Sequence, residues 1–197
     1  MYVQEFILTY GVTKLGYSRE VVFNDTELAQ LYEFYKTVKA ERIKQYYNLF
    51  YVKKSDIREP ELNYEQRLAW SPLREKIDEA AGLTAYAHYF LEYKTHSFCR
   101  SHTDNEEEIG KTGVTLVHAS DDLMGGDSIL YLKYEKDNDY EFDVNWYRDT
   151  PEGGEFVPVV ARQDEGDTLW YDHNQKHAVG LVESGTRVVL ISWYKGA

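Results

Sequence analysis

The stretch TRVVLISWY, residues 186–194, is rich in β-branched and aromatic side chains and predicts a β-strand. Gly, Asp, Asn and Ser separate it from several similar runs earlier in the chain. These runs are TAYAHYFLEY (84–93), TGVTLVHAS (112–120), DSILYLKY (127–134), DTLWYD (167–172) and AVGLV (178–182). Short strands separated by turn signals predict a β-sandwich or jelly roll over residues 83–197.

The first of two predicted helices follows the N-cap signal Asn24-Asp25-Thr26. Apolar and aromatic residues recur after this signal at helical spacing, which indicates one face packed on a core. They are Leu28, Leu31, Tyr32, Tyr35 and Val38. Before this helix, the loose alternation of apolar and polar side chains in residues 1–23 predicts a hairpin.

The second predicted helix has Ser71 as its cap, Pro72 in its first turn and Gly82 at its end. Its apolar stripe consists of Leu73, Ile77 and Ala80. Both helices belong to a support region, residues 1–82, which we expect to pack against one sheet. The predicted fold class is therefore α+β, mainly β, in a single domain.

Length and composition exclude several classes of function. The chain has 197 residues, of which 43% are hydrophobic, and this suits one sizeable core. A net charge of −12 disfavours duplex nucleic acid as a partner, because phosphate recognition needs an excess of Lys and Arg. The single cysteine, Cys99, excludes an intramolecular disulfide framework. Without a basic leader or a long apolar run, we expect a soluble, cytoplasmic protein with no membrane association.

The segment EKDNDYEFDVNWYRDTPEGGEF, residues 135–156, interrupts the series of predicted strands. It is acidic and rich in turn residues, which predicts a long loop or hairpin inserted between two strands. Long insertions at the rim of a barrel often serve function, and rim loops often close over active sites. We therefore expect this segment to act as a lid over a substrate.

Three side chains form a candidate metal site. In an extended strand, His102 and Asp104 point to the same face, so both can reach one ion. His177 follows another strand-like run, GDTLWY at 166–171, and Arg187 lies ten residues further on. Two imidazoles and one carboxylate are typical ligands of non-haem Fe(II) oxygenases. A guanidinium offers a fixed fork for a carboxylate, so 2-oxoglutarate could bind iron at one end and Arg187 at the other.

The order and spacing of these residues resemble the prolyl 4-hydroxylase-like branch of the 2-oxoglutarate/Fe(II) dioxygenases. The resemblance covers residues 86–194, a little over half of the chain, and does not extend to residues 1–80. The matching features, in chain order, are Tyr93, His102 and Asp104, Gly125-Gly126, Gly166 to Tyr171, His177, Arg187 and Trp193. The fold implied by the resemblance is a double-stranded β-helix, a cupin-like jelly roll.

The resemblance also implies ligands and cofactors. Iron would be bound by His102, Asp104 and His177, and Arg187 would bind the distal carboxylate of 2-oxoglutarate. Tyr93 would line the cosubstrate pocket. The implied cofactors are Fe(II), 2-oxoglutarate and O₂, with ascorbate as an optional addition. The implied reaction is a hydroxylation coupled to conversion of 2-oxoglutarate to succinate and carbon dioxide.

Two details depart from the family pattern. His118 stands where the family more often has Tyr, and we expect it to hydrogen-bond a cosubstrate carboxylate. Strict alternation along one strand would also place Tyr93 and His102 on opposite faces. A β-bulge near Thr95-His96 is therefore expected.

The predicted function is hydroxylation of a protein or peptide side chain. Hydroxylation of a free amino acid or another small molecule is the nearest alternative. A cupin-like module that binds a metal without oxidation is a second alternative. A zinc hydrolase that uses His173 and His177 is a third, although the residues around His173 indicate a turn rather than a metal-binding helix.

Overall fold

The computed structural model describes residues 17–42, 52–104, 109–133 and 156–196. Its largest element is an antiparallel sheet in which the strands follow the order β1-β10-β6-β13-β4-β3-β2. In that order the strands are Tyr17–Val21, Asp167–Asp172, Ile109–Ala119, Thr186–Lys195, Ala85–Lys94, Val52–Asp56 and Glu41–Arg42. Non-consecutive neighbours in this order mean that the chain crosses repeatedly between sheets, as in a jelly roll.

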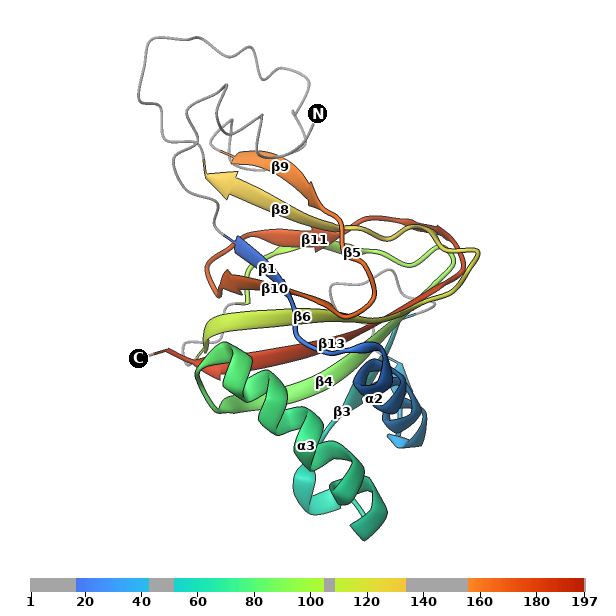
Figure 1. The fold of residues 1–197 in the computed structure, drawn as a ribbon. Helices are drawn as coiled ribbons and strands as arrows, with labels where there is room; N and C mark the ends of the chain where they lie inside the picture. Colours follow the sequence, from blue (N-terminus) through green and yellow to red (C-terminus); the bar gives the residue numbers. More distant parts are fainter. Residues whose placement is uncertain (1–16, 43–51, 105–108, 134–155, 197) are drawn as a thin grey trace, which may run out of the picture.

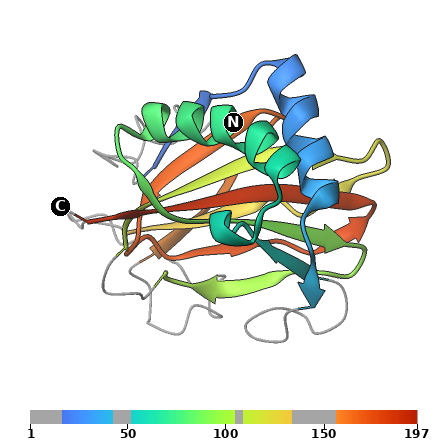
Figure 2. The same cartoon turned by 90° about the horizontal axis from the view of Figure 1, so that it is seen from below.

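A second, four-stranded antiparallel sheet has the order β5-β11-β8-β9. Its strands are Cys99–His102, His177–Val179, Ser128–Lys133 and Phe156–Ala161. A short pair, β7 (Met124–Gly125) and β12 (Val182–Ser184), forms a third sheet. Figures 1 and 2 show the two helices against the large sheet, with β8 and β9 on the far side of the molecule.

Two hydrophobic clusters occupy the two faces of the large sheet. Along β13, Val188 and Leu190 pack towards the helices, whereas Val189 and Ile191 pack towards the small sheet. Both faces are covered, which explains why this strand reads as a nearly continuous apolar run. The predicted fold class, mainly β with helices outside a jelly roll, is confirmed.

Helix α2 (Asp25–Thr37) begins at the predicted cap. Asn24 and Glu27 form a capping box in which each side chain accepts from the backbone N–H of the other residue. Leu28 and Leu31 are buried, as the periodicity predicts, and Phe34 joins them.

Helix α3 (Tyr64–Ala81) is longer than the sequence predicted. It begins after Asn63, which forms a capping box with Gln66, so the predicted start at Ser71 is wrong and Pro72 lies inside the helix. The capping box is a helix start signal in its own right, and it lies well before the proline. The predicted end is correct, because Gly82 has a left-handed backbone conformation. Ala80 is exposed and Ala81 packs against the core in its place.

The predicted hairpin in residues 1–23 falls mostly outside the described residues. Within the described part, β1 pairs with β10, far along the chain. A short 3₁₀ turn, η1 (Glu59–Glu61), precedes α3. No helix in the described ranges is long and apolar enough to cross a membrane.

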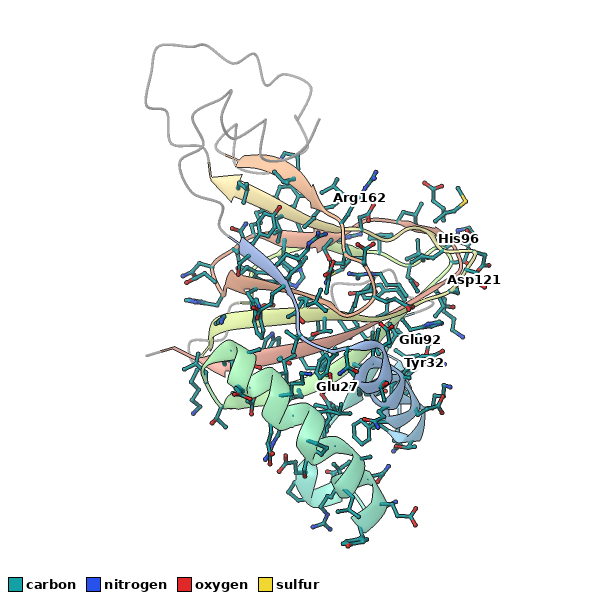
Figure 3. All side chains as sticks on the ribbon, in the orientation of Figure 1. Glu27, Tyr32, Glu92, His96, Asp121 and Arg162 are labelled. Atoms are coloured by element: carbon teal, nitrogen blue, oxygen red, sulfur yellow. The ribbon has the colours of Figure 1, made fainter. Side chains whose placement is uncertain are left out.

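The chain changes sheets between Tyr93 and His102, where a bulge was expected. Strand β4 ends at Lys94 in the large sheet, and β5 begins at Cys99 in the small sheet. His96 has a positive φ of 69° in the turn between them and lies at one end of the molecule (Figure 3). Because Tyr93 and His102 lie in different sheets, both side chains can line the cavity between the sheets. The alternation of one continuous strand therefore does not apply to them.

Candidate active site

The small sheet brings the three predicted metal ligands together. His177 on β11 lies directly opposite His102 on β5. Asp104 lies two residues after the end of β5, and its backbone N–H donates to the carbonyl of His173 at 3.2 Å. One ligand atom from each of the three residues lies within 4.8 Å of the other two. This separation suits three ligands around a single ion.

Backbone carbonyls set the orientation of both imidazoles. His102 Nδ1 lies 2.8 Å from the carbonyl oxygen of Arg100, and His177 Nδ1 lies 2.9 Å from that of Gln175. A carbonyl only accepts, so each Nδ1 carries the proton and each Nε2 keeps its lone pair. Both Nε2 atoms are 3.8 Å from Asp104 Oδ1. The two Nε2 atoms and Asp104 Oδ1 are thus the atoms available to bind a metal.

Thr112 on β6 fixes the third ligand. Its hydroxyl donates to Asp104 Oδ2 at 2.7 Å, and both side chains are buried. This bond occupies Oδ2 and leaves Oδ1 facing the imidazoles. The motif comparison missed Thr112, because its only sequence signal is a hydroxyl on a strand distant from the H-x-D tripeptide.

We expect Thr112→Val to weaken metal binding by about tenfold, whereas Thr112→Ser should retain affinity, because only the serine keeps the hydroxyl. Calorimetric titration with Mn²⁺ measures both. Thr115→Val is a matched control, since Thr115 lies on the same strand and bonds to Thr168 instead. Equal affinities for the valine and serine variants would show that the bond to Asp104 does not matter.

Burial lowers the pKa of His177, and the nearby His102 lowers it further, against the opposing effect of Asp104. The neutral form of His177 is therefore favoured. A neutral imidazole is the form that binds a metal ion.

A small cavity adjoins the three residues between the two sheets. Its volume is about 40 Å³. The large sheet contributes mainly aromatic and aliphatic side chains, and the small sheet adds aliphatic ones and the histidines. The lining includes Tyr89, Tyr93, Leu130, Tyr171 and Val189, together with Ser128 and Arg187. A ligand bound in this cavity would be enclosed by these side chains.

Arg187 extends into this cavity from β13, directly opposite Tyr93 on β4. It is 3% exposed, and its Nη1 has no hydrogen-bond partner. Nη2 donates to Ser128 Oγ at 2.9 Å and to Gln163 Oε1 at 3.0 Å. Burial lowers its pKa, partly offset by Tyr93, Asp127 and Tyr171. Among the described residues, no carboxylate forms an ion pair with this guanidinium.

Gly126, part of the predicted Gly-Gly turn, packs closely against Val182 beside Arg187. Its φ is +74°, and a Cβ there would come within 2.8 Å of Val182 Cγ2 and 3.6 Å of Arg187 Cδ. A larger residue would therefore be strained in backbone conformation and would clash with Val182.

The structure does not bring His118 into the site, so its expected role was wrong. Val117 is an extra residue in β6, because Val188 and Val189 of β13 pair with His118 and Leu116. This bulge inverts the alternation, so His118 turns to the helix side. There it stacks on Tyr32 of α2 and pairs with Glu165 at 3.1 Å.

The other predicted aromatic and histidine residues have different environments. Tyr93 is buried and lines the cavity, whereas Trp193 packs edge-on against Tyr89 in the core between the sheets. His173 lies in a turn and pairs with Asp172 at 3.1 Å. It is not part of the metal-binding group, which disfavours a zinc site built from His173 and His177.

Comparisons with protein-family models and with curated proteins gave no match. Solved structures do match. A 2-oxoglutarate-Fe(II) oxygenase family oxidoreductase from Burkholderia pseudomallei is 14% identical, with a TM-score of 0.68 over 96% of this chain and 90% of that one. A prolyl-4-hydroxylase from Pseudomonas putida is 15% identical, with a TM-score of 0.57 over 98% and 96%.

A third match is HygX from Streptomyces hygroscopicus, solved with nickel, 2-oxoglutarate and hygromycin B. It is 11% identical, with a TM-score of 0.62 over 100% of this chain and 88% of that one. These matches cover a larger share of the chain than the sequence resemblance, which takes in a little over half of it. Together with the jelly roll and the position of the site between its sheets, they show that this chain has the fold of the 2-oxoglutarate- and Fe(II)-dependent oxygenases.

Proposed function

We propose that this chain is a 2-oxoglutarate- and Fe(II)-dependent dioxygenase that hydroxylates a side chain of a protein or peptide. The proposal rests mainly on two features that share one cavity. A His-Asp-His cluster suited to a metal lines it, and so does a buried arginine that forms no ion pair with a described carboxylate.

The donor set fits Fe(II). The ion would be held by Nε2 of His102, Nε2 of His177 and Oδ1 of Asp104, a donor set typical of non-haem Fe(II) oxygenases. The chain contributes the orientation: two carbonyls hold the imidazoles, and Thr112 holds the carboxylate. Loss of such a contact typically lowers metal affinity 10- to 100-fold.

The arginine fits a dicarboxylate. A buried cation without a counter-ion is costly, and a carboxylate of the cosubstrate would supply one. The apolar lining would exclude water from this pair and so strengthen it. Tyrosines are the largest of the side chains that line the cavity.

When bound, iron and 2-oxoglutarate would together supply the oxidising chemistry: O₂ is consumed, 2-oxoglutarate leaves as succinate and carbon dioxide, and one oxygen atom enters a C–H bond of the substrate. The residues of the chain bind, orient and desolvate the reactants.

A protein or peptide substrate is supported by the sequence resemblance to prolyl 4-hydroxylases and by the likeness to the Pseudomonas putida enzyme. A small-molecule substrate is the second candidate, since HygX was solved with hygromycin B bound. The expected lid, residues 135–156, would contribute to this choice, but all of it except Phe156 lies outside the described residues.

We expect succinate to form only when Fe²⁺, 2-oxoglutarate and O₂ are all present. The protein is loaded anaerobically with Fe²⁺ and 2-oxoglutarate, mixed with peptides, amino acids or small molecules, and exposed to air. Mass spectrometry should then find a product that has gained one oxygen atom. A modified peptide supports the first candidate and a modified small molecule the second. Turnover that needs neither O₂ nor 2-oxoglutarate would disprove both.

A further inference from the structure

Arg187 is held by two neutral side chains. Ser128 lies at the start of β8, and Gln163 follows β9. Both oxygens accept from the same nitrogen, Nη2, at 2.9 and 3.0 Å. Ser128 in turn donates its hydroxyl proton to Gln163 Oε1 at 3.1 Å. The Ser128–Gln163 pair therefore fixes one arm of the guanidinium and leaves the other arm unbonded.

The orientation of the Gln163 amide is determined by the backbone. Its Nε2 donates to the carbonyl of Val114 at 2.8 Å and to that of Asp167 at 3.0 Å. Both amide protons are thus used, and a flipped amide would set its oxygen against two carbonyl oxygens. Oε1 must therefore face the arginine.

The pair adds no charge. A carboxylate at either position would neutralise Arg187 inside the protein and remove the need for an external anion. A serine and a glutamine satisfy the geometry of Nη2 and leave Nη1 without a hydrogen-bond partner. Asp127 is near enough to raise the pKa of Arg187 but forms no ion pair with it. A neutral pair at this position lowers the stability of the free protein, because a buried charge without a counter-ion is unfavourable.

We propose that Ser128 and Gln163 are positioning residues that aim Arg187 Nη1 into the cavity and keep its charge uncompensated, so that the distal carboxylate of the cosubstrate becomes the counter-ion. This rests on the proposed function. It adds the reason why the site selects a dicarboxylate over a 2-oxo acid with one carboxylate.

The test compares Ser128→Asp with Ser128→Asn, which have nearly the same shape and differ in charge. The aspartate would supply an internal counter-ion. We expect its thermal midpoint to exceed that of the asparagine variant by about 4 °C or more. We expect its affinity for 2-oxoglutarate to be about 100-fold lower than that of the asparagine variant.

Binding is measured by calorimetry on the Mn²⁺-loaded protein, with 2-oxoglutarate and with 2-oxovalerate, which has the same carbon chain but no distal carboxylate. The two variants should bind Mn²⁺ and 2-oxovalerate equally, so the loss is confined to the distal carboxylate. Equal stabilities and equal 2-oxoglutarate affinities would overturn the inference. So would an aspartate variant that fails to fold while the asparagine variant folds.

Gln163→Leu provides an independent measurement if both Ser128 variants fail to fold. It should weaken 2-oxoglutarate binding about tenfold and leave 2-oxovalerate binding unchanged. The variant removes the bond that orients the arginine and the amide's bonds to the carbonyls of Val114 and Asp167, but it leaves the metal ligands in place. Gln66→Leu on α3 is the matched control, since that amide bonds to Thr37 far from the site. Equal loss of both 2-oxo acids would overturn the inference by showing a merely structural role. A wild-type protein that binds both equally would instead contradict the proposed function.

Discussion

His102→Ala is expected to lower Fe²⁺ affinity by at least about 100-fold and to abolish succinate formation. Loss of a residue that only supports a metal ligand already lowers metal affinity 10- to 100-fold, so loss of a ligand itself should lower it further. Asp104→Asn should behave similarly, because it keeps the shape and the bond to Thr112 but removes the negative charge. Metal affinity is measured by anaerobic titration, and folding by circular dichroism.

His173→Ala is the matched control for this experiment. His173 lies close to Asp104 in the structure, since its carbonyl accepts the backbone N–H of that residue, yet its ring pairs with Asp172. Its loss should leave metal affinity unchanged. If His173→Ala lost the metal and His102→Ala did not, the assignment of the ligands would be wrong.

How much of this site could be predicted from the sequence depended on separation along the chain. His102 and Asp104 are two residues apart, so strand periodicity alone places them on one face. His177 and Arg187 were found because each follows or lies on a recognisable strand. Thr112, Ser128 and Gln163 were not found, because their roles depend on cross-strand contacts between segments that no local pattern connects.

The errors also have a common cause. His118 was assigned by its place in a motif, but one extra residue in β6 turned it to the other face. The bulge expected near Thr95-His96 proved to be a turn from one sheet to the other. Whether two side chains of a strand share a face depends on the number of residues between them, and one extra residue reverses the answer. Single insertions of this kind leave hardly any signal in hydrophobicity, so parity arguments hold only within one uninterrupted strand.

The helices illustrate a different limit. The N-cap signal at Asn24 predicted the start of α2 correctly, whereas the start of α3 was predicted from Pro72 and not from the capping box at Asn63. Proline favours the first turn of a helix, but packing against a core can hold it further in. Trp70, Leu73 and Ile77 bury that face of α3 and stabilise the longer helix.

Arg187→Met is expected to weaken 2-oxoglutarate binding by about 100-fold or more while Fe²⁺ affinity stays the same. Truncation of one member of a buried charge pair typically costs 2–5 kcal/mol, and the metal ligands are untouched. Methionine nearly fills the space of the arginine stem. It also removes a buried charge that has no carboxylate partner among the described residues, so the free protein should be as stable as the wild type or more stable.

The combination of these outcomes separates a binding role from a structural one. An arginine that merely held the fold together would, on removal, lower the thermal midpoint and weaken metal and cosubstrate in parallel. Arg100→Met serves as the control, because Arg100 is an exposed arginine two residues before His102 and is expected to change neither affinity. Unchanged 2-oxoglutarate affinity in Arg187→Met would show that this guanidinium, although buried beside the metal cluster, is not the partner of the distal carboxylate.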